Sequence, residues 1–128
     1  MKKTLLIVDD EPTIQLILKR YFEDDYRVVA KPNGLEAMRW LEDGNTADAI
    51  VADYEMPIMN GPDFIRQLRY SGLHRNVPLI MLSGKEDSSS KILCLRQGAD
   101  DYMVKPFNPE ELELRLQNML RKTSHPTQ

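Results

Sequence analysis

The chain has 128 residues, of which 41% are hydrophobic and 29% charged, and these values are typical of one globular domain with its own core. The formal net charge of −3 at pH 7 argues against direct nucleic-acid binding by this domain. No segment approaches the ~18 apolar residues of a membrane-spanning helix, so we expect a cytoplasmic protein without membrane association. The only cysteine, Cys94, has no partner for a disulfide or a metal site.

Short apolar runs alternate along the chain with segments whose apolar residues recur at helical spacing. The first and third runs are unbroken, which is typical of strands buried on both faces of a parallel sheet. In chain order, the predicted strands cover residues 5–8, 27–30, 49–53, 77–82 and 102–104.

The first predicted helix begins at Pro12, since the first helical turn does not need the N–H that proline lacks. One face of this helix is predicted to consist of Ile14, Ile17, Leu18, Tyr21 and Phe22. The second helix begins at Asn33-Gly34 and ends at Asp43-Gly44-Asn45. Its inward residues are predicted to be Leu35, Met38 and Leu41.

The third predicted helix begins at Gly61-Pro62-Asp63 and buries Phe64, Ile65 and Leu68. We expect Ser88-Ser89-Ser90 to cap the fourth helix, which stops at Gly98. Asn108 and Pro109 are expected to begin the last helix. In that helix one side is predicted to carry Leu112, Leu116, Met119 and Leu120, and Leu114 to point away from them.

Strands that alternate with helices predict right-handed βαβ units and a parallel sheet. The expected fold is therefore α/β: a doubly wound, five-stranded sheet of flavodoxin-like strand order 2-1-3-4-5. We expect the domain to cover residues 1–122. Residues 123–128 lack an apolar pattern and are predicted to form a flexible tail.

Chemically active side chains follow four of the predicted strands. Asp9 and Asp10 follow the first strand, Asp53 ends the third, Ser83 follows the fourth and Lys105 the fifth. The carboxyl ends of parallel strands share one edge of the sheet, so we expect these side chains to converge. Neighbouring carboxylates repel one another unless positive charge lies between them, and hard oxygen ligands favour Mg²⁺. The competing interpretation is that the acids only cap helices.

Four blocks of this sequence together resemble the receiver domain of two-component response regulators, and the likeness covers nearly the whole chain. The blocks are Asp9-Asp10-Glu11, Asp53 to Gly61, Ser83-Gly84 and Gly98 to Phe107. The resemblance implies that Asp53 accepts a phosphoryl group from a histidine kinase or a phosphotransfer protein. It also implies Mg²⁺ held by Asp10, Asp53 and the backbone carbonyl of Glu55, with Asp9 acting through water.

The resemblance further implies a switch. Ser83, more often threonine in this family, would bind a phosphoryl oxygen, Lys105 would supply a counter-charge, and Tyr102 would rotate inward. A plain core tyrosine is the alternative for Tyr102. Gly84 would leave room for the donor histidine, and a simple turn residue is the alternative there. In the family the bond corresponding to Lys105-Pro106 is cis, which sequence alone does not establish here.

Two charged residues should flank the mouth of the site, because each lies two positions after a site residue. Glu55 follows Asp53 in this way, and Lys85 follows Ser83. We hypothesise that Glu55 and Lys85 form an ion pair that limits the approach of water to a phosphoaspartate. Exposed ion pairs add little stability, so the expected effect is on lifetime.

Charges on the fourth helix, fifth strand and fifth helix resemble the inter-subunit ion pairs of receivers attached to winged-helix DNA-binding domains. We hypothesise a two-fold dimer that phosphorylation favours, against the alternative of a solvated surface. In it Lys91 would meet Glu111, Asp101 would meet Arg115, and Asp100 would meet Lys122 or Arg121 of the partner.

The expected function is that of a phosphoacceptor, which assists its own phosphorylation and dephosphorylation but is not otherwise an enzyme. One alternative is a Mg²⁺-dependent phosphatase with Asp53 as nucleophile, suggested by the acid at Glu55. A flavodoxin-type electron carrier shares the fold, but Asp9-Asp10-Glu11 would repel the phosphate of its cofactor. The third alternative is an interaction module that is never phosphorylated.

Overall fold

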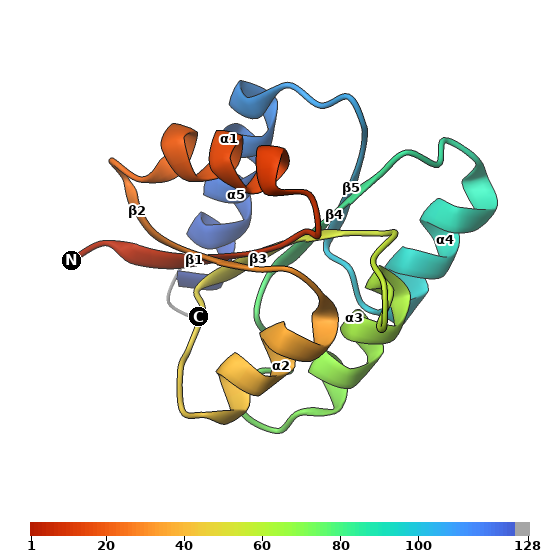
Figure 1. Cartoon of the computed structure of the whole chain (residues 1–128), viewed down its shortest axis with the longest axis horizontal. Coiled ribbons are helices and arrows are strands. Elements are labelled where there is room, and N and C mark those ends of the chain that lie inside the picture. Colours follow the sequence, from red (N-terminus) through yellow and green to blue (C-terminus); the bar gives the residue numbers. More distant parts are fainter. Residues whose placement is uncertain (125–128) are drawn as a thin grey trace.

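The computed structural model describes residues 1–124 and contains, within them, a five-stranded parallel sheet of order β2-β1-β3-β4-β5 (Figure 1). The predicted fold class and strand order are confirmed. The strands are β1 (Lys3–Val8), β2 (Tyr26–Lys31), β3 (Ala49–Asp53), β4 (Leu79–Ser83) and β5 (Asp101–Val104).

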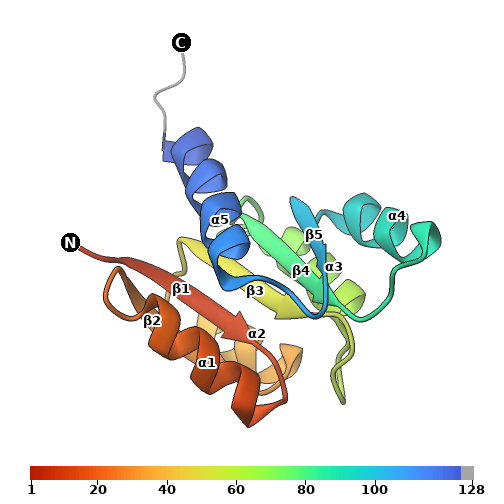
Figure 2. The same ribbon diagram turned by 90° about the horizontal axis from the view of Figure 1, so that it is seen from above.

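Helices cover both faces of the sheet (Figures 1 and 2). They are α1 (Pro12–Phe22), α2 (Gly34–Glu42), α3 (Gly61–Tyr70), α4 (Ser88–Gln97) and α5 (Pro109–Ser124). Successive side chains of a strand point to opposite faces, so each strand contributes to two cores. Leu6 and Ile50 pack in the core beneath α2, α3 and α4, whereas their neighbours Leu5 and Val51 pack beneath α1 and α5.

The beginning of α4 differs from the prediction. Asp87, and not the serine run, is the N-cap, because its carboxylate accepts hydrogen bonds from the Ser90 N–H at 2.9 Å and from the Ser90 hydroxyl. An ionised carboxylate is the stronger acceptor at a helix N-terminus. The Asn33 cap of α2 is as predicted, and the Asn108 side chain accepts from the Glu110 N–H at the start of α5.

The buried face of α1 is narrower than predicted. Leu18 and Phe22 are fully buried, but Ile17 is 46% exposed and Tyr21 39% exposed. The apolar stripe of this helix is wider than its contact with the sheet, so residues at the edge of the stripe stay in solvent. Leu35 of α2 is likewise only half-buried.

Several element boundaries also depart from the sequence-based expectation, and those of β4 and α5 have a direct bearing on it. β4 begins at Leu79 and not at Val77, because the Val77 N–H donates to the His74 carbonyl in a turn. α5 includes residues 123 and 124, and the rest of the predicted tail, 125–128, lies outside the described residues. Leu112 and Leu116 are buried and Leu114 is exposed, as predicted. None of the helices in residues 1–124 has the length and apolar character needed to cross a membrane.

Candidate phosphoacceptor site

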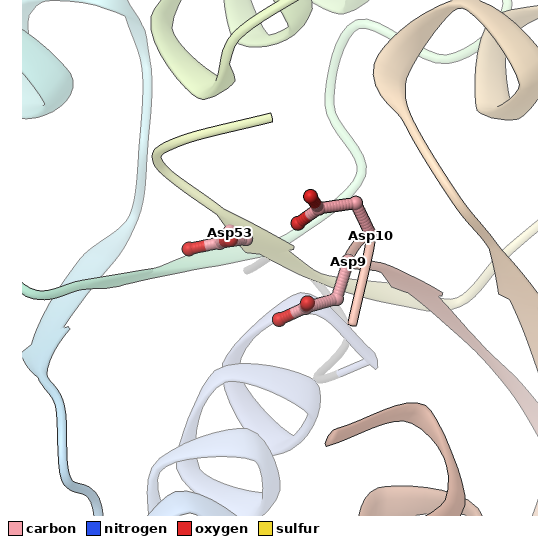
Figure 3. A group of neighbouring side chains, drawn as sticks. All are labelled: Asp9, Asp10 and Asp53. Carbon is pink, nitrogen blue, oxygen red and sulfur yellow. The ribbon is translucent and has the colours of Figure 1, made fainter. Parts of the chain in front are cut away.

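Three carboxylates meet at the carboxyl edge of the sheet (Figure 3). β1 and β3 are neighbours with Val8 opposite Ala52, so Asp9 and Asp10 emerge beside Asp53. One oxygen from each of the three carboxylates lies within 4.8 Å of the others. The convergence predicted from the strand ends is therefore present.

Burial makes this cluster electrostatically unfavourable on its own. Asp9 is 2% exposed and Asp53 6%, whereas Asp10 is exposed. Burial raises the pKa of Asp53, and the hydrogen bond and charge of Lys105 offset only part of that rise. Burial also raises the pKa of Asp9, and the nearby charge of Asp53 adds to the effect.

Lys105 supplies positive charge to the cluster from the end of β5. Its Nζ lies 3.1 Å from Asp53 Oδ1, 3.5 Å from Asp9 Oδ2 and 3.9 Å from a carboxylate oxygen of Glu11. Burial alone would lower the pKa of Lys105, but the hydrogen bond to Asp53 and the surrounding negative charges raise it above its ordinary value. The peptide bond between Lys105 and Pro106 is cis.

The charges and donor atoms of the cluster fit a divalent cation. Asp9, Asp10 and Asp53 carry three negative charges, and Lys105 neutralises one of them. Carboxylate oxygens that are grouped but partly open to solvent suit Mg²⁺, which keeps several of its water ligands. The backbone N–H of Glu55 lowers the pKa of Asp53, and the Glu55 carbonyl remains a predicted ligand.

The predicted switch residues lie in one hydrogen-bonded chain beside the cluster. The Lys85 N–H donates to Ser83 Oγ at 2.9 Å, and the Tyr102 hydroxyl donates to the Lys85 carbonyl at 2.6 Å. Tyr102 is 7% exposed, so its ring is already inward. The β4–α4 loop thus connects Ser83 directly to Tyr102. A Cβ at Gly84 would meet no atom within 4 Å, which leaves open space at that point of the mouth.

Glu55 and Lys85 lie across the mouth from each other. A carboxylate oxygen of Glu55 is 3.7 Å from Lys85 Nζ, and the side chains are 69% and 41% exposed, respectively. The same Nζ lies 5.8 Å from the centroid of the Tyr54 ring. The structure therefore brings together the two residues that were expected to pair, and their role remains a prediction.

Four charged residues of the hypothesised dimer face, Asp100, Asp101, Glu111 and Arg115, have partners within this chain. Arg115 contacts Asp101 and Glu111, each at 2.8 Å. Asp100 accepts hydrogen bonds from Arg69 at 3.1 Å and from the Leu79 N–H. Exposed positions on this face include Lys91 and Lys122. The structure describes one chain, so the inter-subunit pairs remain predictions.

Two polar residues with several contacts were not singled out from the sequence. Gln15 binds the Asp9 backbone, and Arg69 binds the carbonyls of Gly98, Arg75 and Val77. Each is a polar residue on a helix, and nothing in the sequence separates it from a solvated side chain. Only the folded chain shows which carbonyls lie within reach.

Comparison with known proteins agrees with this geometry. Residues 5–117 match the family model described as "Response regulator receiver domain". The chain is 41% identical over 129 residues to the probable transcriptional regulator ycf27 of Cyanophora paradoxa, covering 98% of this chain and 52% of that protein. The transcriptional regulatory protein SrrA of Staphylococcus aureus is 38% identical over 128 residues, with 99% of this chain and 52% of that protein covered. The chain therefore spans about half the length of these two relatives.

Solved structures show the same fold. The receiver domain of the Francisella response regulator 1452 superposes with a TM-score of 0.87 at 32% identity, covering 96% of this chain and all of that one. The receiver domain of the sensor histidine kinase PA1611 from Pseudomonas aeruginosa PAO1, with a magnesium ion in its active-site cleft, gives a TM-score of 0.85 at 30% identity, over 94% and 98% of the two chains. The chain belongs to the response regulator receiver domain family.

Proposed function

We propose that Asp53 is the phosphoacceptor and takes its phosphoryl group from a phosphohistidine on a histidine kinase or a phosphotransfer protein. The observation that carries this assignment is the 3.1 Å contact between Asp53 and Lys105 in a group of three carboxylates. Asp9 already accepts the Glu11 N–H and lies deepest in the cluster, while Asp53 ends its strand at the mouth. Asp53 is thus the best-placed nucleophile.

In the proposed reaction an Asp53 carboxylate oxygen attacks the phosphorus, the P–N bond of the phosphohistidine breaks, and its electrons leave with the imidazole. A carboxylate is a weak nucleophile, so rate enhancement depends on position and charge. Lys105 holds the Asp53 carboxylate and faces the negative charge that develops on the transferred group. Mg²⁺, held by Asp10, Asp53 and the Glu55 carbonyl, with Asp9 acting through water, would supply further charge neutralisation when bound.

The phosphorylated state differs from the free state by about one additional negative charge at residue 53. The hydroxyl proton of Ser83 is available to a phosphoryl oxygen, because Ser83 Oγ accepts rather than donates in its bond with the Lys85 N–H. Movement of Ser83 toward that oxygen pulls on the β4–α4 loop and on the Tyr102 hydroxyl bound to it. This couples the site to the α4–β5–α5 face.

A groove beside Lys105 offers a docking place for the phosphohistidine-bearing partner. Its volume is about 530 Å³ and its surface is mostly apolar. A partner seated there would lie directly next to Lys105, which contacts Asp53. The groove is lined by Ile14, Ile17, Lys105, Pro106, Phe107 and Pro109.

The output proposed for this receiver is a change at the α4–β5–α5 face that controls a partner or an output domain. This chain spans about half the length of ycf27 and of SrrA, and both relatives are named as transcriptional regulators. Their names favour an output in the regulation of transcription. We also propose that phosphorylation favours a homodimer and that the protein is cytoplasmic. The family match and the relatives do not favour the phosphatase alternative.

The proposal is tested by incubating the protein with an acyl phosphate, with and without Mg²⁺, and measuring intact mass and size. Wild-type protein should gain one phosphoryl group only when Mg²⁺ is present, and Asp53→Asn should gain none. Release of inorganic phosphate from a small ester over many turnovers would instead support the phosphatase alternative.

A further inference from the structure

The loop between β1 and α1 carries two of the three clustered acids and is held by residues outside the cluster. The Asp9 N–H donates to the Lys31 carbonyl of β2 at 3.1 Å, and the Glu11 N–H donates to Asp9 Oδ1 at 2.9 Å. Two further bonds come from one residue of α1, Gln15. Its N–H donates to the Glu11 carbonyl at 3.1 Å, and its side-chain Nε2 to the Asp9 carbonyl at 2.6 Å.

The bond from the Gln15 side chain has a definite direction. A carbonyl oxygen can only accept, so the amide must present Nε2 and not Oε1 to Asp9. Asp9 lies beyond the end of β1 and before the first turn of α1, so neither the sheet nor the helix provides an N–H for its carbonyl. Among the residues that the structure describes, Gln15 is the hydrogen-bond partner of this carbonyl.

Fixing the Asp9 carbonyl also fixes the residue that follows it. The carbonyl of Asp9 and the N–H of Asp10 belong to one planar peptide unit, so the orientation of the carbonyl sets where Asp10 begins. The Asp10 side chain is exposed, and no hydrogen bond or ion pair holds it within residues 1–124. Its carboxylate nevertheless points toward Asp53 (Figure 3). The Asp9–Asp10 peptide sets the position of the Asp10 Cα, from which this side chain extends toward the cluster.

We propose that Gln15 is a positioning residue, whose side-chain amide orients the Asp9–Asp10 peptide and so holds the Asp10 carboxylate ready for a divalent cation. This inference rests on the proposed function, since it concerns the same site. It assigns to α1 a part in cation binding, through a residue that does not itself contact the ion.

The inference predicts that loss of the Gln15 amide reduces the preference of the site for Mg²⁺ over Ca²⁺. Mg²⁺ requires nearly ideal octahedral ligand geometry, whereas Ca²⁺ tolerates irregular geometry. A loosened Asp10 should therefore weaken Mg²⁺ binding more than Ca²⁺ binding. A residue that only supports folding would lower both affinities by the same factor.

The test compares wild type with Gln15→Met, which keeps the length of the side chain but has no N–H donor. Gln67→Met is the matched control, because Gln67 is exposed on α3 and its side chain makes no contact with the cluster. Mg²⁺ and Ca²⁺ affinities of metal-free protein are measured by titration calorimetry. We expect Gln15→Met to bind Mg²⁺ about tenfold more weakly, a loss typical of residues that orient metal ligands. The loss for Ca²⁺ should be smaller, and Gln67→Met should match wild type.

Two results would overturn the inference while leaving the proposed function intact. One is a Gln15→Met variant with wild-type Mg²⁺ affinity, and the other is an equal loss of Mg²⁺ and Ca²⁺ affinity. Wild-type protein that binds neither cation would contradict the proposed function itself, and the inference with it.

Discussion

At the scale of single residues, the site buries carboxylates whose charged form is unfavourable for the stability of the folded state. Burial raises the pKa of Asp9 and Asp53, so the folded state holds protons at these positions more tightly than the unfolded chain does. Their contribution to stability is therefore full at pH values below the unfolded pKa, near 4, and is lost as pH rises through the folded pKa. At neutral pH and without a cation, the cluster reduces the free energy of unfolding.

The first prediction concerns Asp10, whose charge raises the pKa of Asp53. Asp10→Asn should raise the Tm of metal-free protein by about 2–4 °C, because it removes repulsion in the cluster. It should also abolish the further increase in Tm that Mg²⁺ gives to wild type. Thermal unfolding with and without Mg²⁺ measures both effects. Asp24→Asn, which removes an exposed acid in the α1–β2 turn, is the control for net charge and should leave both unchanged.

The second prediction concerns the lifetime of the phosphorylated state. Removing Lys85 breaks its contact with Glu55 and opens the mouth to water. Lys85→Ala should therefore shorten the phosphoaspartate lifetime by up to about fivefold, the range that an exposed ion pair allows. Decay of phosphorylated protein, followed by intact mass, measures the lifetime. A lifetime equal to that of wild type and of the Lys19→Ala control would show that the pair has no role.

At the scale of elements, α1 and the segment after β5 together form the groove beside the site. The narrower buried face of α1 leaves Ile17 46% exposed, and this side chain lines the groove with Phe107. An apolar residue that the fold does not bury is available to a partner. The departure from the predicted helix face thus coincides with the proposed docking place.

The third prediction separates docking from chemistry. Ile17→Ser should slow phosphoryl transfer from a phosphohistidine-bearing partner by about tenfold, as loss of one good apolar contact at an interface would. It should leave labelling by a small acyl phosphate unchanged, since the Asp53 environment is intact. Ile92→Ser on α4, where Ile92 is 49% exposed, is the matched control. Equal slowing with both donors would contradict the docking role of the groove.

The hydrogen bonds of Arg69 connect α3 to the hypothesised dimer face. Arg69 of α3 donates to the carbonyls of Gly98 and Val77 and to the Asp100 carboxylate, and its side chain is 19% exposed. Asp100 also accepts the Leu79 N–H. Asp101 is likewise engaged within its own chain, by the Tyr102 N–H and by Arg115, so both acids would have to exchange partners in the hypothesised dimer.

At the scale of the whole molecule, phosphorylation at one edge of the sheet is expected to change association through a distant face. The fourth prediction is that beryllofluoride with Mg²⁺, which mimics the phosphoryl group, shifts the protein toward a dimer in sedimentation. Arg115→Ala should weaken that dimer, because it removes the partner of Asp101. Identical sedimentation of free and beryllofluoride-loaded protein would contradict the dimer hypothesis.

The strand ends explain why so much of the site could be predicted from the sequence. Asp9, Asp53, Ser83 and Lys105 all follow short apolar runs, and the topology of a parallel sheet then brings them together. Local sequence patterns were less informative where neighbouring residues could serve as the cap of the same helix. Asp87 displaced the serine run as the cap of α4 because two types of capping residue lay side by side.

Other features depend on contacts between residues far apart in the chain. The exposure of Ile17 depends on how α1 lies against the sheet, and the contacts of Arg69 depend on the α4–β5 turn, 29 residues away in sequence. Gln15 reaches a carbonyl six positions earlier, which helical spacing does not indicate. These features could be recognised only in the folded chain.

The central claim is that Asp53, and neither Asp9 nor Asp10, carries the phosphoryl group. Borohydride reduces an acyl phosphate to an alcohol and leaves a free carboxylate unchanged, so the modified residue can be located by peptide mass mapping. After incubation with an acyl phosphate and Mg²⁺, we expect the reduced residue at position 53 alone. Reduction at position 9 or 10, or continued labelling of Asp53→Asn, would contradict the assignment.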